Sequence, residues 1–160
     1  MEIRGIQPAD RAMVDHLLET LDDSKRHLGR QAAKFRQEKN YQPILEIVAE
    51  EDGKITGTAS LREITINDIV CLMVGPVLEI EDRLAPLIDT LKKRAFQSGY
   101  RFIIWQQLDE KDPKTFDFKP AADYQLYLPG QEDGDDNLYI YQLVKNSLND
   151  VSGEVEFSTE

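Results

Sequence analysis

Two apolar runs separated by one helical pattern constrain the fold most. Ile69–Val74 is an uncharged run rich in β-forming residues, short enough for a strand and apolar enough to be covered on both faces. Apolar residues then recur at helical spacing at Leu84, Leu87, Ile88, Leu91 and Ala95. Tyr100–Trp105 is the second apolar run. A strand, a helix and a strand in this order predict a βαβ unit with two parallel strands.

The segments before this unit mix helical and β patterns. A short strand is expected at 2–6, then a helix that Pro8 opens and a second, more polar helix after 22–24. Their apolar stripes are Met13, Val14, Leu17, Leu18 and Leu21 in the first helix, and Leu28, Ala32 and Phe35 in the second. Asp52-Gly53 between two β-type runs, 44–50 and 55–66, predicts a hairpin. Its second strand is expected to place these residues on one face: Ile55, Gly57, Ala59 and Leu61.

Further strands are expected near 124–128 and 138–144. The fold class is therefore predicted as α/β (α+β): a mixed, mostly antiparallel sheet with a central parallel pair, flanked by helices. We expect one domain over residues 1–145. Residues 146–160 contain acidic side chains and no Lys or Arg, so we expect them to form a disordered tail.

Composition narrows the class of protein. The chain has 160 residues, with 19 Lys and Arg against 30 Asp and Glu, which gives a net charge of −11. This charge repels phosphate backbones, so no nucleic-acid partner is expected. No run approaches the ~20 apolar residues of a membrane helix, so no membrane partner is expected either. The first residues lack a secretory pattern and Cys71 is the single cysteine, which together indicate a cytoplasmic location.

Two phrases carry a resemblance to a known family. The hairpin 47–57, IVAEEDGKITG, resembles the pattern V-A-E-x-D-G-x-I-V-G, and 116–124, FDFKPAADY, resembles F-G-F-x-P-A. With the order of the elements, these phrases resemble the GNAT N-acetyltransferase superfamily over about residues 2–144. The resemblance implies the GNAT acyl-CoA N-acyltransferase fold. It also implies that acetyl-CoA donates an acetyl group to a primary amine of a small molecule or peptide.

The resemblance also implies where acetyl-CoA would bind. In the family, the pantetheine lies along the main chain of the central strand, here Leu72, Met73 and Val74. The pyrophosphate binds N–H groups at the start of the next helix, where the helix dipole favours an anion. This places Arg83, Leu84 and Ala85 among the cofactor-binding candidates. An acidic surface would favour a cationic amine, and the sequence leaves a homodimer open.

The phosphate loop departs from the family pattern (R/Q)-x-x-G-x-(G/A). Glu79 takes the basic position, and Asp82 and Leu84 take the glycine positions. Glu79, Glu81 and Asp82 against Arg83 leave the loop with a net charge of −2, which opposes a phosphate. The alternative is therefore a catalytically inactive GNAT-fold binding or regulatory module, in which these acids stabilise the helix dipole.

The groups that would move protons are a second open point. Many relatives have a Tyr that protonates the departing sulfur, but Pro113 takes that position here. Asp109, Tyr124 or Tyr127 could substitute, and Tyr124 is the catalytic candidate among them. Glu63 is the candidate base for the amine proton, and an exposed carboxylate at a strand edge is the alternative interpretation.

Other reactive residue types are expected to be structural. Cys71 lies in an apolar run and is interpreted as core rather than as a nucleophile. His16 and His27 lie on different helices without further ligands at metal-binding spacing, so no metal is expected. Trp105 is either a core residue or a ligand contact at the end of a parallel strand. A solvated turn is expected for Asp133, Asp135 and Asp136.

Overall fold

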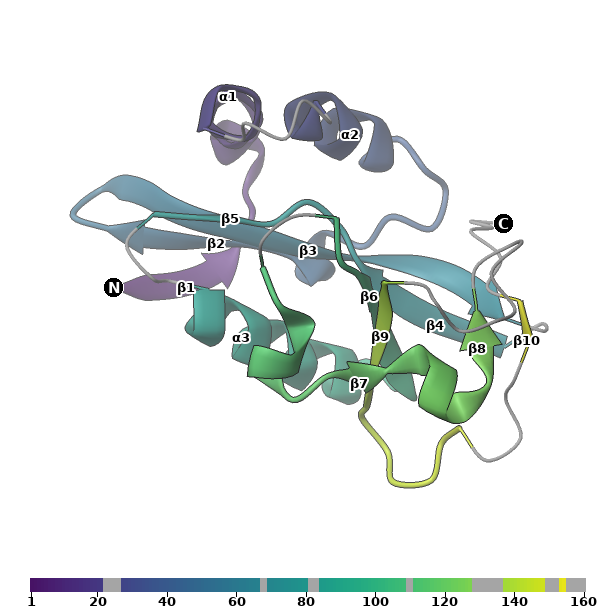
Figure 1. Cartoon of the computed structure of the whole chain (residues 1–160). Coiled ribbons are helices and arrows are strands. Elements are labelled where there is room, and N and C mark those ends of the chain that lie inside the picture. Colours follow the sequence, from purple (N-terminus) through teal and green to yellow (C-terminus); the bar gives the residue numbers. More distant parts are fainter. Residues whose placement is uncertain are drawn as a thin grey trace. The chain divides into compact units, whose positions relative to one another are not determined.

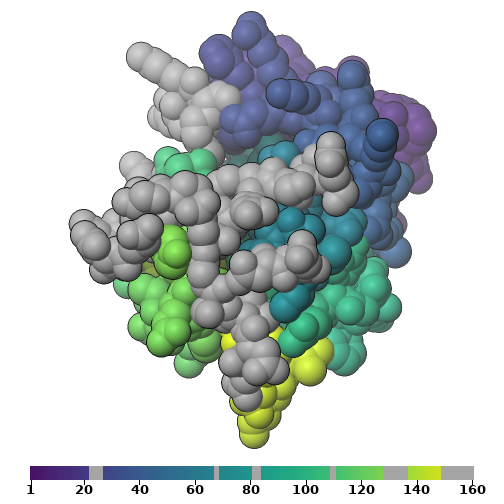
Figure 2. Space-filling model, turned by 90° about the vertical axis from the view of Figure 1, so that its right-hand side faces the viewer, coloured from purple at the N-terminus to yellow at the C-terminus, as the bar shows by residue number. Residues whose placement is uncertain are grey.

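A computed structural model describes residues 1–21, 27–66, 69–80, 84–108, 111–127, 137–148 and 153–154. The remaining residues are drawn in grey in Figures 1 and 2. The chain folds into two compact units: unit 1 comprises Met1–Arg62 and Gly75–Arg94, and unit 2 comprises Glu63–Val74 and Ala95–Glu160. Each unit is described separately. The single domain over 1–145 stays a prediction.

Unit 1 contains the predicted N-terminal strands and helices. Its strands are β1 (Glu2–Gly5), β2 (Glu46–Glu51), β3 (Lys54–Ile66, which continues into unit 2) and β5 (Leu78–Glu79). Its helices are α1 (Arg11–Leu21), α2 (Leu28–Phe35) and α3 (Leu84–Gln97, whose last turn lies in unit 2), with 3-10 turns η1 (Pro8–Asp10) and η2 (Pro43–Leu45).

The strands of unit 1 form an antiparallel sheet in the order β1-β2-β3, and β5 pairs with β3. Helices α1 and α2 cover one face and α3 the other (Figure 1). The core under α1 and α2 consists of Ile6, Val14, Leu18, Leu28, Ala32, Val48 and Leu78. On the α3 face, a Cβ added to Gly57 would lie 2.9 Å from Leu87 Cδ1. Glycine therefore lets α3 approach β3 closely.

The β2–β3 hairpin contains an irregularity that the sequence pattern did not predict. Ala49 pairs with Gly57 but Glu50 pairs with Ile55, so Thr56 is an extra residue on β3. Ile55 packs against the core under α1 and α2, whereas Gly57 lies under Leu87 of α3. The expectation that Ile55 and Gly57 share a face is wrong, because the bulge shifts the alternation of side chains by one residue.

Helix α3 confirms the predicted periodicity. Leu87, Ile88, Leu91 and Ala95 are all buried. Gly99 follows the helix with φ +89°, and the N–H of Tyr100 donates to the Ala95 carbonyl at 3.2 Å, which closes the last turn. Across the described ranges of the chain, no helix has the length and apolar character to cross a membrane.

Unit 2 is built around the predicted βαβ strands. It contains the end of β3, then β4 (Ile69–Val74), β6 (Phe102–Gln106), β7 (Lys119–Pro120), β8 (Leu126–Tyr127), β9 (Leu138–Gln142) and β10 (Gly153–Glu154). The strand order is β3-β4-β6-β9-β7, in which β4 and β6 are parallel and β9 is antiparallel to β6 and β7. The mixed, mostly antiparallel sheet with a central parallel pair is confirmed.

Two short turns precede β8, and the second includes the first residue of the strand expected at 124–128. Pro113–Phe116 and Ala121–Tyr124 form the 3-10 turns η3 and η4, so Tyr124 ends a turn rather than starting a strand. Gln125 follows with φ +60°, a left-handed conformation that interrupts an extended chain. Of the described residues in the strand expected at 124–128, Leu126 and Tyr127 form β8, which pairs in parallel with β10, and Leu128 lies outside the described residues.

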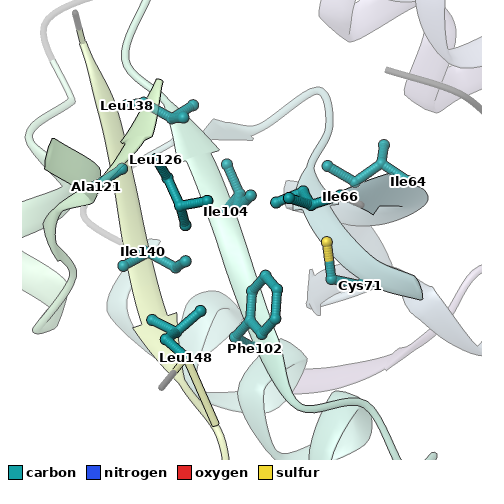
Figure 3. Packing of buried hydrophobic residues seen from close by; sticks show 10 residues of the cluster. All are labelled: Ile64, Ile66, Cys71, Phe102, Ile104, Ala121, Leu126, Leu138, Ile140 and Leu148. Atoms are coloured by element: carbon teal, nitrogen blue, oxygen red, sulfur yellow. The ribbon is translucent and has the colours of Figure 1, made fainter. Parts of the chain in front are cut away.

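One face of the unit 2 sheet carries the core shown in Figure 3. Its members are Ile64, Ile66, Cys71, Phe102, Ile104, Ala121, Leu126, Leu138, Ile140 and Leu148. Leu148 comes from the segment expected to be a tail, and neighbouring Ser147 accepts a hydrogen bond from Arg101 Nη2 at 2.7 Å through its carbonyl. These two residues are therefore packed into unit 2.

Candidate functional site

At the centre of unit 2, the ladder between the parallel strands β4 and β6 ends before β4 itself ends. Leu72 pairs with Ile103 and Met73 with Ile104, and the ladder between β4 and β6 ends there. Strand β6 continues through Trp105, which pairs with Tyr139 of β9. The main chain of Val74 therefore lies at a strand edge that β6 no longer covers, and its polar groups there can bind an extended ligand.

The residue after β4 is held in unit 1. The N–H of Gly75 donates to the carbonyl of Ser60 on β3 at 2.9 Å. A Cβ at Gly75 would lie 2.6 Å from Ser60 Oγ, closer than real side-chain contacts allow. The chain therefore needs glycine at this position to pass beside β3 as it leaves β4.

The segment between β5 and α3 is the predicted phosphate loop. Ile80 N–H donates to the Thr56 carbonyl at 2.7 Å, which fixes the start of the loop on β3. Glu81, Asp82 and Arg83 lie outside the described residues. Helix α3 then begins at Leu84, whose side chain is buried, and Ala85 is exposed.

Some groups in this segment favour the binding of an anion, and another opposes it. The first N–H groups of α3, including those of Leu84 and Ala85, have no acceptor within the helix, which suits a phosphate. Glu79 Oε2 is buried and has no hydrogen-bond partner in the described part of the chain. This carboxylate oxygen cannot donate to a phosphate oxygen, so the main chain favours the anion and Glu79 opposes it.

The two catalytic candidates lie on opposite faces of the unit 2 sheet. Ile64 faces the core of Figure 3, so its strand neighbour Glu63 faces the other way. Glu63 Oε2 accepts a hydrogen bond from the Tyr100 hydroxyl at 3.4 Å. Tyr124 packs against the core itself, and its hydroxyl accepts from Gln142 Nε2 at 3.4 Å. The structure does not bring the two candidates together, and their roles stay predictions.

Cys71 is a core residue, as predicted. Its side chain is fully buried in the unit 2 cluster. Burial, with a smaller contribution from the charge of Glu63, raises the pKa of the Cys71 thiol to about 12. The thiol stays protonated at neutral pH and is therefore a poor nucleophile.

Both histidines belong to the helical segments of unit 1. His16 is exposed on α1, and His27 precedes α2 with its Nδ1 3.6 Å from Glu19 Oε2. Where the chain is described, no three His, Cys, Asp or Glu side chains are grouped to hold a metal ion. The absence of a metal cofactor stays a prediction, and Asp133, Asp135 and Asp136 lie outside the described residues.

Trp105 is packed into an aromatic group of unit 2. Its ring stacks on Phe116 with centroids 5.7 Å apart and meets Phe118 edge-on at 5.4 Å. Phe118 in turn contacts Tyr141 at 5.7 Å. Pro113, which takes the expected Tyr position, is buried at the start of η3. The core interpretation of Trp105 is the one that this packing favours.

Sequence reasoning missed a buried polar network on the α1 and α2 face of unit 1. Arg36 forms a bidentate ion pair with Glu46. Its Nε donates to Oε1 at 2.9 Å, and its Nη2 donates to Oε2 at 2.6 Å. Arg36 Nη1 also lies 2.8 Å from Asp15 Oδ1, and the Tyr41 hydroxyl donates to Glu46 Oε1 at 2.7 Å. Burial and the bond to Glu46 raise the pKa of Tyr41. The available signal was Glu46 itself, a charge that opens an apolar strand.

Sequence reasoning also missed a second arginine–glutamate pair on this face, which makes one hydrogen bond instead of two. Arg62 Nη2 donates to Glu38 Oε1 at 3.0 Å. The adjacent atoms, Arg62 Nε and Glu38 Oε2, are buried and have no hydrogen-bond partner among the described residues. Arg62 lies on β3 two residues beyond Ser60, so both side chains project from the same face of the strand.

Comparisons with known proteins agree on the fold. No family model matches the chain, and no curated protein matches it. The chain is similar to the GNAT family N-acetyltransferase YhbS of Escherichia coli, solved in complex with CoA: the TM-score is 0.77 at 22% identity, over 98% of this chain and 89% of that chain.

Two further solved structures are similar. A GNAT family acetyltransferase of Brucella melitensis in complex with acetyl-CoA gives a TM-score of 0.65 at 19% identity, over 97% of this chain and 92% of that chain. A putative acetyltransferase of Salmonella typhimurium, yncA, with its cofactor acetyl-CoA, gives 0.53 at 19% identity, over 91% and 95%. The chain has the GNAT acyl-CoA N-acyltransferase fold, as its sequence phrases predicted.

Proposed function

We propose that this protein is an N-acetyltransferase that moves an acetyl group from acetyl-CoA to a primary amine of a small molecule or peptide. The observation that carries the proposal is the end of the β4–β6 ladder at Met73 and Ile104, because it leaves a main-chain edge on β4. The GNAT fold supports it, since similar structures were solved with CoA or acetyl-CoA.

The binding roles follow from the two segments described above. Main-chain groups of Leu72, Met73 and Val74 would bind the pantetheine. The first N–H groups of α3, at Leu84 and Ala85, would bind the pyrophosphate together with Arg83. Acetyl-CoA supplies the acetyl group as an activated thioester, so the protein itself needs no covalent intermediate.

The proton roles are assigned to separate residues. The Glu63 carboxylate would accept the proton of the attacking ammonium group, and the Tyr124 hydroxyl would donate a proton to the departing sulfur. The two side chains lie on opposite faces of the unit 2 sheet, so each role needs a test of its own. A net charge of −11 would attract an amine that is cationic before it reacts. A cytoplasmic location fits this role, and a homodimer stays open.

Thermal unfolding with and without millimolar acetyl-CoA tests the proposal, with ATP as a control for general anion effects. A ligand at 100 times its Kd adds about 2.7 kcal/mol, which corresponds to a midpoint shift of about 5–11 °C for a chain of this size. A shift with acetyl-CoA and not with ATP supports the proposal, and thiol release with a panel of amines then measures transfer. No shift would leave a binding or regulatory module that has lost the cofactor.

A further inference from the structure

We propose that the bulge in β3 positions the anion-binding N–H groups of α3, with Thr56 and Gly57 as the positioning residues. This inference rests on the proposed acetyltransferase function, because it concerns how the chain would bind the pyrophosphate of acetyl-CoA. It starts from Thr56, the extra residue of β3 opposite β2. All the residues that carry the argument belong to unit 1.

The extra residue connects β3 to the segment that follows β5. The pairing with β2 passes from Ile55 to Gly57, so Thr56 has no place of its own in that ladder. The Thr56 carbonyl accepts the N–H of Ile80 at 2.7 Å, directly after β5 ends. The Thr56 hydroxyl donates to the Ala49 carbonyl at 3.4 Å, which ties the bulge to β2. The bulge therefore fixes the point where the chain leaves β5.

The next residue of β3 contacts the start of α3. A Cβ added to Gly57 would lie 2.9 Å from Leu87 Cδ1 and 3.2 Å from the carbonyl oxygen of Leu78. Leu87 is the fourth residue of α3, and its side chain is fully buried. The first turn of α3 therefore packs directly on the main chain of β3, with no room for a side chain between them.

Two adjacent residues of β3 thus hold both ends of the segment that leads from β5 into α3. Thr56 binds Ile80 at one end, and Gly57 contacts Leu87 at the other. Ile80 and Leu84 are four residues apart in the sequence, so the chain between them spans at most about 14 Å. Because this segment is short and held at both ends, a change at either contact moves the first N–H groups of α3.

The position of these N–H groups matters for an anion. The N–H groups of Leu84 and Ala85 have no acceptor within the helix, and they bind a phosphate only when they lie at hydrogen-bond distance from it. Glu79 contributes a carboxylate, which accepts and cannot donate. The main-chain donors therefore carry more of the binding, and the contacts that position them become more important.

Two substitutions at Ile80 test the first contact. Ile80→Pro removes the N–H that Thr56 accepts, and its ring suits the extended conformation of the preceding Glu79. Ile80→Ala is the matched control, because it loses the side chain and keeps the N–H. The ligands are acetyl-CoA and S-acetylpantetheine, which has the same thioester and pantetheine and lacks the pyrophosphate.

Calorimetric titration should separate the two ligands. In Ile80→Pro, we expect the Kd of acetyl-CoA to rise at least about tenfold, the effect of one lost hydrogen bond to a charged group, while that of S-acetylpantetheine stays within about twofold. Ile80→Ala should keep the wild-type ratio of the two constants. General damage to the fold in Ile80→Pro would weaken both ligands equally and leave the ratio unchanged, which would overturn the inference.

A substitution at Gly57 tests the second contact independently. Gly57→Ala should raise the Kd of acetyl-CoA at least about threefold, because the new methyl group displaces the fully buried Leu87 and with it the start of α3. Leu87→Val removes the Cδ1 atom that the methyl group would meet. The double variant should therefore return toward the wild-type ratio. A double variant that binds acetyl-CoA more weakly than Gly57→Ala would contradict the positioning role of Gly57.

A readout without acetyl-CoA separates this inference from the proposed function. The amide resonances of Leu84 and Ala85 should shift on titration with inorganic pyrophosphate, at a concentration at least about tenfold higher in Ile80→Pro than in Ile80→Ala. If pyrophosphate binds in this way and acetyl-CoA does not, the acetyltransferase function fails and the positioning role stands. If acetyl-CoA binds and the two variants respond alike, only the positioning role is overturned. Wild-type resonances that do not respond to pyrophosphate would overturn it as well.

Discussion

Arg36 Nη2 lies 2.6 Å from Glu46 Oε2, and both side chains are almost fully buried, at 6% and 3% exposure. Arg36 follows α2 and Glu46 begins β2, so this ion pair joins the helix layer of unit 1 to its sheet. Burial alone would lower the pKa of Arg36, but the bonds to Glu46 and Asp15 outweigh it and raise the pKa. The guanidinium therefore depends on its partners to stay charged in the interior.

Glu46→Gln should lower the free energy of unfolding by about 3–5 kcal/mol, because it leaves the Arg36 charge buried without its main partner. Urea unfolding measures the loss. Glu50→Gln is the matched control, since Glu50 pairs with Arg4 at a partly exposed position, where such pairs contribute about 0–1 kcal/mol. Equal losses in the two variants would show that burial does not set the strength of the Arg36 pair.

Gly75→Ala should destabilise the protein by about 1–3 kcal/mol, because the new methyl group would meet Ser60 Oγ at 2.6 Å. Ser60→Ala removes that oxygen, so the double variant should be more stable than the sum of the two single effects predicts. Urea unfolding of the four proteins gives the coupling energy. Additive effects would mean that the contact between Gly75 and Ser60 does not limit residue size at position 75.

The sequence predicted the order and type of the main helices and strands, because each of them shows a local pattern within its own residues. The apolar run of β4, the periodicity of α3 and the Asp-Gly turn of the hairpin are local signals, and all three are confirmed. The bulge at Thr56 is not local: it appears only in how β2 and β3 pair. The prediction assumed that side chains alternate regularly along the strand, and it therefore placed Ile55 on the wrong face.

In the candidate site, too, local patterns could be predicted from the sequence and contacts between distant residues could not. The strand that contains Leu72, Met73 and Val74 was predicted correctly because a central strand is recognisable by its apolar run, and the binding role of these residues stays a prediction. The Arg62–Glu38 and Arg36–Glu46 pairs were missed because their members are 24 and 10 residues apart and charged residues are common in this chain. Pairing of distant charges depends on the packing of α2 over the sheet, which a single sequence does not display.

The thiol of Cys71 should make stability depend on pH in the alkaline range. Burial raises its pKa from the ordinary value of 9.0 to about 12 in the folded protein. Between these values the unfolded chain loses the thiol proton and the folded chain keeps it, so stability falls as pH rises from about 9 toward 12. Below pH 9 the thiol contributes no pH dependence.

Urea unfolding at pH 9.5 and 10.5 tests this expectation. Wild type should lose about 1 kcal/mol more than Cys71→Ala over this interval, since a full proton difference gives about 1.4 kcal/mol per pH unit. Comparison with the variant cancels the titration of Lys and Tyr side chains. Parallel curves for the two proteins would mean that the thiol is not held protonated by its burial.

Glu79→Gln should strengthen acetyl-CoA binding. A carboxylate about 6 Å from a phosphate costs about 1–3 kcal/mol, so removing its charge should lower the Kd by about fivefold to 150-fold. Calorimetric titration measures the change. Glu2→Gln, at an exposed position of β1, removes the same charge elsewhere and should leave the Kd within about twofold. A similar gain in both variants would assign the effect to net charge rather than to the loop.

Glu63→Gln and Tyr124→Phe should each lower the rate of acetyl transfer by about 10²–10⁴-fold while acetyl-CoA binding is retained. The two variants should differ in pH profile. Loss of a base removes the rise of kcat/KM on the acidic side, whereas loss of an acid removes the fall on the alkaline side. Tyr127→Phe is the comparison, because Tyr127 is the other tyrosine that could donate this proton and lies three residues beyond Tyr124, in β8.

The outcomes assign the roles one residue at a time. A rate loss in Glu63→Gln with an unchanged pH profile would make Glu63 a positioning residue, held by its hydrogen bond from Tyr100. Equal losses in Tyr124→Phe and Tyr127→Phe would indicate that the segment η4 to β8 supports the site through packing, since Tyr124 lies against the core of unit 2. A large loss confined to Tyr124→Phe, with its alkaline limb gone, would assign the proton that reaches the sulfur to this hydroxyl, in place of the side chain that Pro113 cannot supply.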